Sequence, residues 1–595
     1  MKILGISAHY HDSAAALVVD GLPICAVQEE RMSRRKNDAG FPIGAIEWCL
    51  EHAKLEPDDL DAVVFYERSM LKFDRILTTA LRAFPRSFRS FPRAMKNSLG
   101  EKVWVRGIIA SQLGVPRRKI FFTDHHASHA ALAFLTAPTR RAAILTADGV
   151  GEWATLTTGQ ATRTADRTEI RLEREVRFPH SLGLLYSAFT AYLGFPVNEG
   201  EYKVMGLAAY GRPTMTAQVG KLIRRTADGA FALVSEYFDF QTEAERSYSS
   251  KFVDLFGPAR NRYEPVDLES AEGRRFADCA ASVQRVLEDV LVDIARDLRR
   301  TTGLTDLCFG GGVALNGVAN ARMLAESGFE RMFVPSAPGD AGCALGAALY
   351  ADRVYFRNPD RDIPDHPFWG PAVDGAELER AAREDNHPVE HLDSHALLDR
   401  VAAALADGCI VGWMDGACEF GPRALGHRSI LAAPHAGEMR DRLNRDIKYR
   451  EEFRPFAPVV TREAASRYFE LPQGGTRLAR FMSGVFPVRP EWRPQLAAVT
   501  HVDGTARVQV LDREMAPALY ALLESYGRRT GIPVLLNTSF NVAGEPIVTR
   551  ALEGYSTFRR CGIDLLVAGS TVVRKRSAPA SPTAISMQER VASWV

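Results

Sequence analysis

Short apolar runs of strand character alternate with helical periodicity along most of this chain, and that alternation restricts the fold more than any other feature. The first set is KILGIS, AALVVDG and PICAVQ, a helical pattern over residues 43–55, and DAVVFY. Strands that alternate with helices build layered α/β cores. The sequence therefore predicts an α/β fold.

A second set of the same kind follows the first. It comprises AAILTADG, helical patterns over residues 181–194 and 278–301, LCFGGG and MFVPS. Because these strands also end in glycine-containing turns, we expect two similar halves in the N-terminal part of the chain.

A Pro- and Asp-rich stretch without periodicity, residues 353–370, is typical of a linker. After it, a helical pattern over residues 394–407 and the runs CIVGWM, EFGPRALGH and PVLLNTS predict a separate α/β unit. The last residues read as a tail. The predicted division is 1–360, 371–573 and a tail at 574–595.

Length and composition exclude several classes of protein. A chain of 595 residues exceeds the size of a single core, and 74 Lys+Arg against 73 Asp+Glu argue against a surface built wholly for nucleic acid or membrane. Eight scattered cysteines without a CxxC pair indicate reduced core residues. Since no run reaches the length of a membrane span and the start lacks a signal-peptide pattern, we expect a cytoplasmic protein. One local exception is the basic, aromatic-rich stretch 68–106, which is either a solvated helical insertion or a surface for phosphates and bases.

The block DHHASHA carries the strongest metal signal. His125 and His129 are four residues apart, so on a helix they share one face, whereas His126 points elsewhere. Asp148 follows the apolar run AAILTA, and Asp340 precedes a helical pattern. Two histidines and two carboxylates suit iron, zinc or manganese. The alternative is an ordinary histidine pair that binds no metal.

Glycine-rich turns surround these residues. His11-Asp12-Ser13 follows the first strand, Gly149-Val150-Gly151 follows Asp148, and Gly310-Gly311-Gly312 precedes Asn316. They resemble the phosphate and adenosine turns of actin and sugar-kinase type ATPases, in which backbone N–H groups approach phosphate. Tight structural turns are the alternative for each. The chain has neither GxxxxGK[ST] nor GxGxxG.

The C-terminal part carries cations beside glycine, proline or aromatic residues, where surface lysines and arginines are less common. They are Arg423, Lys448, Arg454 and Arg507. Together with the hydroxyls of Thr538 or Ser539 they predict a pocket for a small, highly charged phosphate. Structural ion pairs between elements are the alternative.

On these residues the chain resembles the carbamoyltransferase family that includes the nodulation, cephamycin, tobramycin and saxitoxin-pathway O-carbamoyltransferases. The similarity runs from Gly5 to about Ile563. It rests on eleven ordered blocks: GISAHYHDSAAALVVDG, EERMSRRKNDAGFP, DHHASHA, LTADGVGEWAT, FPHSLGLLYSAFTAYLGF, GEYKVMGLAAYG, GGVALN, EFGPRALGHRSIL, FRPFAP, THVDGTARVQ and NTSFNVAGEP.

The resemblance implies a fold and a reaction. It implies an N-terminal actin-like ATPase domain and a C-terminal domain similar to threonylcarbamoyl-adenylate synthase (YrdC-like). In such enzymes the C-terminal site joins carbamoyl phosphate to ATP, supplied with Mg, and forms carbamoyl adenylate and pyrophosphate. The N-terminal site then transfers the carbamoyl group to a hydroxyl of a small-molecule natural product. Keeping the reactive adenylate from water explains two buried sites in one chain.

The resemblance also assigns residues, which we carry over as predictions. The metal, iron before zinc or manganese, lies on His125, His129, Asp148 and Asp340, and His11 is the general base. Residues expected at the N-terminal nucleotide site are Lys203, Gly206, Gly311, Gly312 and Asn316. Residues expected to bind carbamoyl phosphate and ATP are Arg423, Lys448, Arg454, Arg507 and Ser539.

Two rival functions remain at this point. The basic stretch 68–106 and the shared N-terminal fold suggest a tRNA-modifying threonylcarbamoyl transferase, which predicts RNA binding that weakens steeply with salt. The near-zero net charge and the fusion of both activities disfavour it. The other rival is a non-catalytic nucleotide-binding regulator, which predicts no turnover. The sequence does not identify the acceptor.

Overall fold

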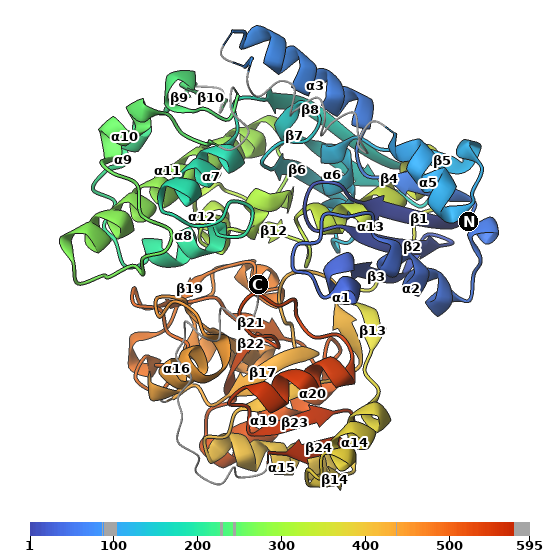
Figure 1. The fold of residues 1–595 in the computed structure, drawn as a ribbon, viewed down its shortest axis with the longest axis vertical. Helices are drawn as coiled ribbons and strands as arrows, with labels where there is room; N and C mark the ends of the chain where they lie inside the picture. Colours follow the sequence, from blue (N-terminus) through green and yellow to red (C-terminus); the bar gives the residue numbers. More distant parts are fainter. Residues whose placement is uncertain (86, 89–103, 227–229, 242–245, 436, 576–595) are drawn as a thin grey trace.

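We describe the protein from a computed structural model that covers residues 1–85, 87–88, 104–226, 230–241, 246–435 and 437–575 (Figure 1). Of the predicted tail, residues 576–595 lie outside this description. Two large sheets form the N-terminal unit, residues 1–356, and a third forms the C-terminal unit, residues 368–575. In Figure 1 the C-terminal unit, yellow to red, lies below the N-terminal unit.

The first sheet has the strand order β3-β2-β1-β4-β5. β1 and β2 pair antiparallel, as do β2 and β3, whereas β1, β4 and β5 run parallel to one another. The four runs predicted as strands in the first set are β1 to β4. The strand bounds are β1 Lys2–Ser7, β2 Ala14–Val19, β3 Leu22–Gln28, β4 Ala62–Phe65 and β5 Ile120–Phe122.

The second sheet repeats this arrangement with the order β8-β7-β6-β11-β12. Its first three strands form an antiparallel meander, and β6, β11 and β12 are parallel. The predicted duplication of the N-terminal half is therefore present in the strand topology. The bounds are β6 Arg141–Ala147, β7 Ala154–Arg163, β8 Thr168–Arg177, β11 Asp306–Gly310 and β12 Arg331–Phe333.

Two helices fill the space between the N-terminal sheets. Helix α6 (His125–Leu135) packs on the second sheet and α13 (Asp340–Tyr350) on the first, and the two helices pack on each other. Gly5 allows this approach, because a Cβ at that position would lie 1.9 Å from the carbonyl oxygen of Ala344 in α13. The arrangement fixes where the first residues of both helices lie.

Further helices pack on both N-terminal sheets, α2 on the first and α11 on the second. Long helix α11 contacts α7, α8, α9 and α12, and the helical patterns predicted at 181–194 and 278–301 correspond to α7 and α11. No helix in the described part of the chain is both long and apolar enough to span a membrane. The bounds are α1 Glu29–Ser33, α2 Ile43–Ala53, α3 Ser69–Arg82, α5 Val105–Leu113, α7 Leu182–Tyr192, α8 Glu201–Ala208, α9 Thr216–Gly220, α10 Ser250–Phe256, α11 Ala271–Thr302 and α12 Gly317–Glu326.

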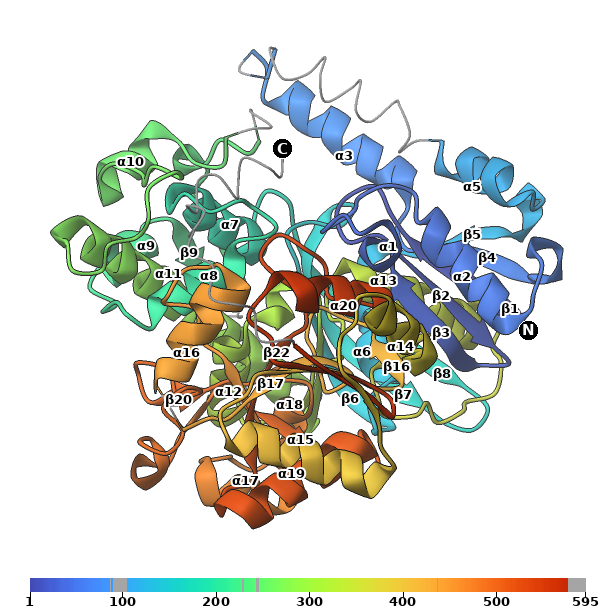
Figure 2. The same cartoon turned by 60° about the horizontal axis from the view of Figure 1, so that its bottom comes forward.

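Helix α3 contains part of the basic stretch, of which residues 86 and 89–103 lie outside the described ranges. In both views it lies on the side of the N-terminal unit away from the C-terminal unit (Figures 1 and 2). Two of its cations face inward: Lys72 pairs with Glu67 at 2.8 Å, and Arg75 donates to the carbonyl oxygen of Gly151 at 2.8 Å. These two side chains are therefore used within the fold.

The C-terminal unit is a mixed eight-stranded sheet with the order β14-β24-β23-β15-β17-β22-β18-β21. Helices α15 and α19 pack together, and so do α14 and α20 (Figure 2). The helix predicted over 394–407 and the strands predicted at CIVGWM and PVLLNTS are α15, β15 and β22. The strand bounds are β14 Val389–His391, β15 Val411–Met414, β17 Arg428–Ala432, β18 Ala457–Thr461, β21 Gln509–Leu511, β22 Val534–Ser539, β23 Leu565–Ala568 and β24 Thr571–Arg574. The helix bounds are α14 Gly375–Glu384, α15 Ser394–Ala406, α16 Gly437–Leu443, α17 Arg462–Tyr468, α18 Gly475–Arg480, α19 Pro517–Thr530 and α20 Ala551–Arg560.

Smaller pairings complete the described strands. Strands β9 and β10 form one ribbon, β13 pairs with β16 where the linker enters the C-terminal unit, and β19 pairs with β20. Their bounds are β9 Ile223–Arg225, β10 Phe231–Leu233, β13 Phe368–Ala372, β16 Ala417–Glu419, β19 Phe486–Pro487 and β20 Thr505–Ala506.

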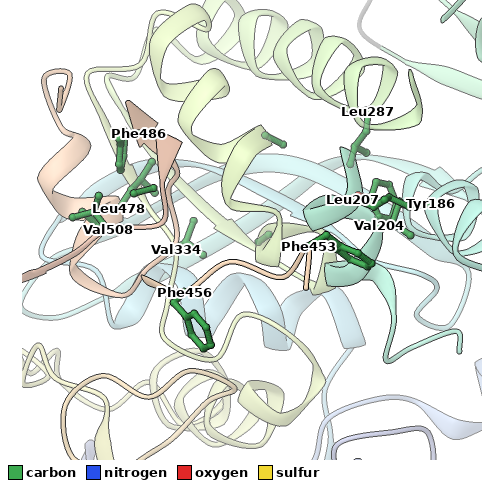
Figure 3. Close-up of a cluster of buried hydrophobic side chains, with 14 of the residues drawn as sticks. Tyr186, Val204, Leu207, Leu287, Val334, Phe453, Phe456, Leu478, Phe486 and Val508 are labelled. Carbon is green, nitrogen blue, oxygen red and sulfur yellow. The ribbon is translucent and has the colours of Figure 1, made fainter. Parts of the chain in front are cut away.

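Apolar side chains join the two units. Val204 and Leu207 of α8 belong to the same buried cluster as Phe453 and Phe456 of the C-terminal unit (Figure 3). Burial of such side chains stabilises by about 1.5–3 kcal/mol each. A shared core therefore packs the two units together, and polar residues line a cavity beside it.

Candidate active site

Two helix starts and one strand end bring four ligand atoms together. His125 is the first residue of α6, Asp340 is the first residue of α13, and Asp148 directly follows β6. With His129, one turn along α6, they place one ligand atom each within 4.8 Å of one another. The structure thus assembles the four residues that the sequence predicted for the metal.

The distances within this cluster suit a cation. The Nε2 atoms of His125 and His129 lie 3.1 Å apart and 3.1 and 2.9 Å from Oδ2 of Asp148, and they lie 3.7 and 3.5 Å from Oδ1 of Asp340. Oδ2 of Asp340 and Nδ1 of His125 are buried and have no hydrogen-bond partner among the described residues. Four convergent N and O donors with unsatisfied polar atoms can hold one divalent ion.

The titration of the cluster points the same way. Burial acts against a charged imidazole at His129, but Cys343, Asp148 and Asp340 outweigh it and raise the pKa of His129 well above the usual range. Burial also acts against a charged Asp148, but His125 and His129 hold the pKa of that carboxyl well below its usual range. The imidazolium of His129 and the carboxylate of Asp148 therefore stabilise each other's charged form.

The neighbours of the cluster orient its histidines. His126 is buried and bonded through both ring nitrogens, to Thr146 Oγ1 at 2.6 Å and to the carbonyl oxygen of Ala154 at 2.9 Å, so it points away as predicted. Sγ of Cys343 lies 3.3 Å from Nδ1 of His129. Glu152 accepts the backbone N–H of His125 at 3.0 Å. The contact with Cys343 leaves Nε2 of His129 to face the ligand position, and the contact with Glu152 holds the start of α6.

His11 lies near the metal cluster on a cavity wall. Its Nδ1 is 2.9 Å from Oδ2 of Asp12. Burial lowers the pKa of His11, but the hydrogen bond to Asp12 and the charges of Asp340 and Asp148 outweigh burial and raise it to about 9. A cation held by Asp148 and Asp340 would offset their charges and lower the pKa of His11.

One cavity of about 420 Å³ connects the two groups of predicted residues. We call it the first cavity. Its lining includes His11, Asp148 and Asp340 from the N-terminal unit and Arg423, Arg454 and Arg507 from the C-terminal unit. The sequence predicts two separate sites, and the structure places residues of both around one continuous space.

The positive charges of neighbouring arginines in this cavity lower one another's pKa. Burial and then the charge of Arg507 lower the pKa of Arg423 to about 9, and burial and then Arg454 lower the pKa of Arg507 to about 10. Arg423 also donates to the carbonyl oxygen of Leu315 at 2.9 Å. Buried cations that repel each other form a strong site for a polyanion.

A second cavity of about 840 Å³ shares part of this wall. Lys203, Lys448, Arg454 and Ser539 line it. Lys203 pairs with Glu451 at 2.6 Å, so one predicted nucleotide residue of the N-terminal unit binds a carboxylate of the C-terminal unit. Arg454 and Ser539 line both cavities.

Lys448 has a different environment from the arginines. Its Nζ donates to Oγ of Ser539 at 3.2 Å and to the carbonyl and side-chain oxygens of Asn541 at 3.0 and 2.9 Å. Burial first, then Arg450 and Arg454, hold the pKa of Lys448 well below its usual range. It therefore fixes the turn that carries Ser539 as well as facing the cavity.

Three of the predicted glycine and asparagine residues, Gly311, Gly312 and Asn316, occupy the turn between β11 and α12. Gly311 has φ +97°, and a Cβ there would lie 2.2 Å from the carbonyl oxygen of Ala147, so only glycine fits. Gly312 and Asn316 line the first cavity. Asn316 accepts the N–H of Ala319 at 3.0 Å and so caps α12. Gly206 packs near Phe453 and Pro455 and is not part of either lining.

Sequence reasoning missed two buried cations. Arg31, in the block EERMSRRKNDAGFP, and Arg450, in NRDIKYREEFRPFAP, both line the first cavity. Burial first, then Arg454, hold the pKa of Arg450 well below its usual range. Both lie in blocks with several neighbouring cations, and spacing alone does not separate the inward-facing side chains from the solvated ones.

Comparison with known proteins identifies the family. The family model described as carbamoyltransferase N-terminus matches residues 2–349, and that described as carbamoyltransferase C-terminus matches residues 402–575. The chain belongs to the carbamoyltransferase family and is an enzyme of that class. The resemblance drawn from the sequence blocks is confirmed.

Relatives match over nearly the whole chain. An uncharacterised protein of Synechocystis is 42% identical over 97% of both chains. Nodulation protein NolNO of Sinorhizobium fredii is 36% identical over 96% of this chain and 79% of that protein. Among solved structures, component A of the (R)-2-hydroxyglutaryl-CoA dehydratase of Acidaminococcus fermentans is 13% identical, with a TM-score of 0.31 over 59% of this chain and 97% of that one, too low to support a conclusion.

Proposed function

We propose that the protein is an ATP-dependent O-carbamoyltransferase that works in two steps. Residues 371–573, a YrdC-like domain, form carbamoyl adenylate from carbamoyl phosphate and ATP with Mg. Residues 1–360, an actin-like ATPase domain, transfer the carbamoyl group to a hydroxyl of a small-molecule natural product. The observation that carries this proposal is the shared cavity, with Asp148 and Asp340 on one wall and Arg423 on the other.

The first step consumes carbamoyl phosphate, water and ATP. Water releases the phosphoryl group of carbamoyl phosphate as inorganic phosphate, and the carbamate oxygen attacks the α-phosphorus of ATP and displaces pyrophosphate. Both reactants are polyanions, so converging guanidinium groups lower their mutual repulsion. Arg423, Arg454 and Arg507 are the cations we assign to this step, with Lys448 and Ser539 at the adjoining turn.

The second step takes place beside His11. The acceptor oxygen attacks the carbamoyl carbon, its bond to the adenylate oxygen breaks, and AMP leaves. The hydroxyl proton passes to His11, whose imidazole is held by Asp12. Gly311, Gly312 and Asn316 form the turn against which we expect the nucleotide to lie, and Lys203 and Gly206 lie further out on α8.

His125, His129, Asp148 and Asp340 would hold the metal. We propose iron, and the same donor set accepts zinc or manganese. When bound, the ion supplies Lewis-acid stabilisation of negative oxygen.

The test is turnover of the purified, metal-loaded chain with carbamoyl phosphate and ATP. We expect pyrophosphate to appear only when carbamoyl phosphate is present. A folded protein that releases none, with metal bound and Mg-ATP saturating, would refute the adenylation step. Release of pyrophosphate with no transfer to any of a panel of hydroxylated acceptors would leave adenylation intact and contradict only the acceptor class tested.

A further inference from the structure

Gln28, the last residue of β3, and Arg31 of α1 both bind one residue of the C-terminal unit. Nη2 of Arg31 donates to the carbonyl oxygen of Gly421 at 2.9 Å, and Oε1 of Gln28 accepts the N–H of Gly421 at 3.3 Å. The same Oε1 lies 3.4 Å from Nη2 of Arg31. Both backbone polar groups of Gly421 are thus held by side chains nearly 400 residues away in sequence.

The backbone of Gly421 is also closely packed, which restricts its conformation further. Its φ is +135°, and a Cβ there would lie 2.5 Å from the carbonyl oxygen of Ser336. The hydroxyl of Ser336 also donates to the carbonyl oxygen of Phe420 at 3.1 Å. The N-terminal unit therefore defines the course of this loop where it enters the cavity.

The loop carries Arg423 two residues later. The guanidinium of Arg423 then donates to the carbonyl oxygen of Leu315, again in the N-terminal unit, at 2.9 Å. Between these two fixed points lies Pro422, which restricts the backbone further. The direction in which Arg423 faces the first cavity is therefore set from outside its own unit.

Arg31 is buried although much of its guanidinium group lacks hydrogen-bond partners among the described residues. The residue is 2% exposed, and its Nε and Nη1 have no hydrogen-bond partner among the described residues. Glu30 is the nearest carboxylate, with Oε1 4.0 Å from Nη1. A buried charge with few partners is costly, and an apolar side chain of similar volume would avoid that cost.

We propose that Arg31 and Gln28 are positioning residues for Arg423. On this view the N-terminal unit orients the cation that binds the phosphoryl group of carbamoyl phosphate in the adenylation step, which rests on the proposed function. A misplacement of about 1 Å at a substrate-binding group costs on the order of 100-fold in rate. Loss of the hydrogen bonds to Gly421 should therefore weaken the binding of carbamoyl phosphate more than the binding of ATP or metal.

The test compares variants of the full chain in carbamoyl-phosphate-dependent pyrophosphate release. We expect Arg31→Met to raise KM for carbamoyl phosphate about 10- to 100-fold, with KM for ATP changed less than about threefold and metal content unchanged. Arg31→Lys keeps one donor for Gly421 and should restore part of the loss. If Arg31→Met fails to fold, Gln28→Leu replaces it in the same measurement, because this variant removes the hydrogen bond from the N–H of Gly421.

Arg477→Met is the matched control. Arg477 also joins the units, since its guanidinium lies 4.5 Å from the ring of Phe333, but it does not touch the loop 420–423. If Arg31→Met and Arg477→Met change both Michaelis constants alike and in step with their melting temperatures, the positioning role is wrong. A wild-type chain without pyrophosphate release would instead refute the adenylation function, and calorimetric binding of carbamoyl phosphate to the same variants would then test the positioning role.

Discussion

Arg423 of the C-terminal unit lies with its Nη2 2.9 Å from the carbonyl oxygen of Leu315 in the N-terminal unit. Leu315 ends the glycine turn that begins at Gly312, and a Cβ on Gly312 would lie 2.9 Å from Oδ1 of Asp148. One short chain of contacts therefore runs from the arginines to the metal ligands. Both ends of this chain line the first cavity, so an intermediate made at one end would have a continuous space to the other.

The first prediction concerns Arg423. Arg423→Ala should lower carbamoyl-phosphate-dependent pyrophosphate release by about 100-fold or more, because a buried guanidinium facing a polyanion is lost. Arg423→Lys should recover only a small part, since an ammonium cannot reproduce the planar fork of donors. Arg445→Ala is the control, because Arg445 is 73% exposed and pairs with Asp446 at the surface. Activity of Arg423→Ala within threefold of wild type would disprove the assignment.

The second prediction separates the two steps at the metal ligands. His125→Ala should bind metal at least about tenfold more weakly, because one of four donors is lost, and should lose carbamoyl transfer while retaining pyrophosphate release. Metal content by mass spectrometry and both half-reactions give the readout. His391→Ala is the control, since His391 is a half-exposed surface histidine paired with Glu379. Loss of pyrophosphate release with transfer from supplied adenylate intact would mean that the steps are assigned to the wrong sites.

The third prediction concerns the base. His11→Gln should lower transfer by about 100-fold or more while sparing metal content and pyrophosphate release. Asp12→Asn should shift the rise of transfer rate with pH to lower pH, because the bond to Asp12 and its charge raise the pKa of His11. A pH–rate profile of the transfer step measures both effects. An unchanged profile in Asp12→Asn would indicate that His11 only orients the acceptor.

Much of the fold was predictable because it depends on local pattern. The runs KILGIS and AAILTADG form β1 and β6, the middle strands of the two N-terminal sheets. Their apolar character alone indicates buried strands. His125 and His129 were predictable for the same reason, since a helix fixes their relation within one turn. Asp148 directly follows the end of β6 and Asp340 is the first residue of α13, and ligands often bind at such ends of strands and helices.

The joining of the two sites was not predictable from spacing. Arg31 meets Gly421 and Lys203 meets Glu451 across packed units whose shared core includes Leu207 and Phe453, and such contacts leave no periodic signal. The exposed or buried state of a cation in a basic block also depends on that packing. The sequence therefore predicts the residues of each half separately, and the fold places most of them around adjoining cavities.

The last prediction concerns stability and pH. Burial first lowers the pKa of His501 to about 4, although Asp503 acts in the opposite direction, whereas an unfolded histidine titrates near 6.5. Between these values the unfolded chain binds a proton that the folded chain does not, so this contribution is complete above pH 6.5 and is lost as the pH falls toward 4. Its size is roughly 3 kcal/mol at most.

His501→Gln should therefore make the melting temperature fall less steeply than in wild type between pH 6.5 and 4.5, as measured by calorimetry. Its ring contacts Thr505 Oγ1 at 3.1 Å, so the variant also loses a constant amount of stability at neutral pH, and the slope with pH is the informative quantity. His395→Gln, at an exposed histidine, is the control and should keep the wild-type slope. Equal slopes in all three proteins would show that His501 has the same pKa in the folded and the unfolded chain. Its burial would then not lower that pKa.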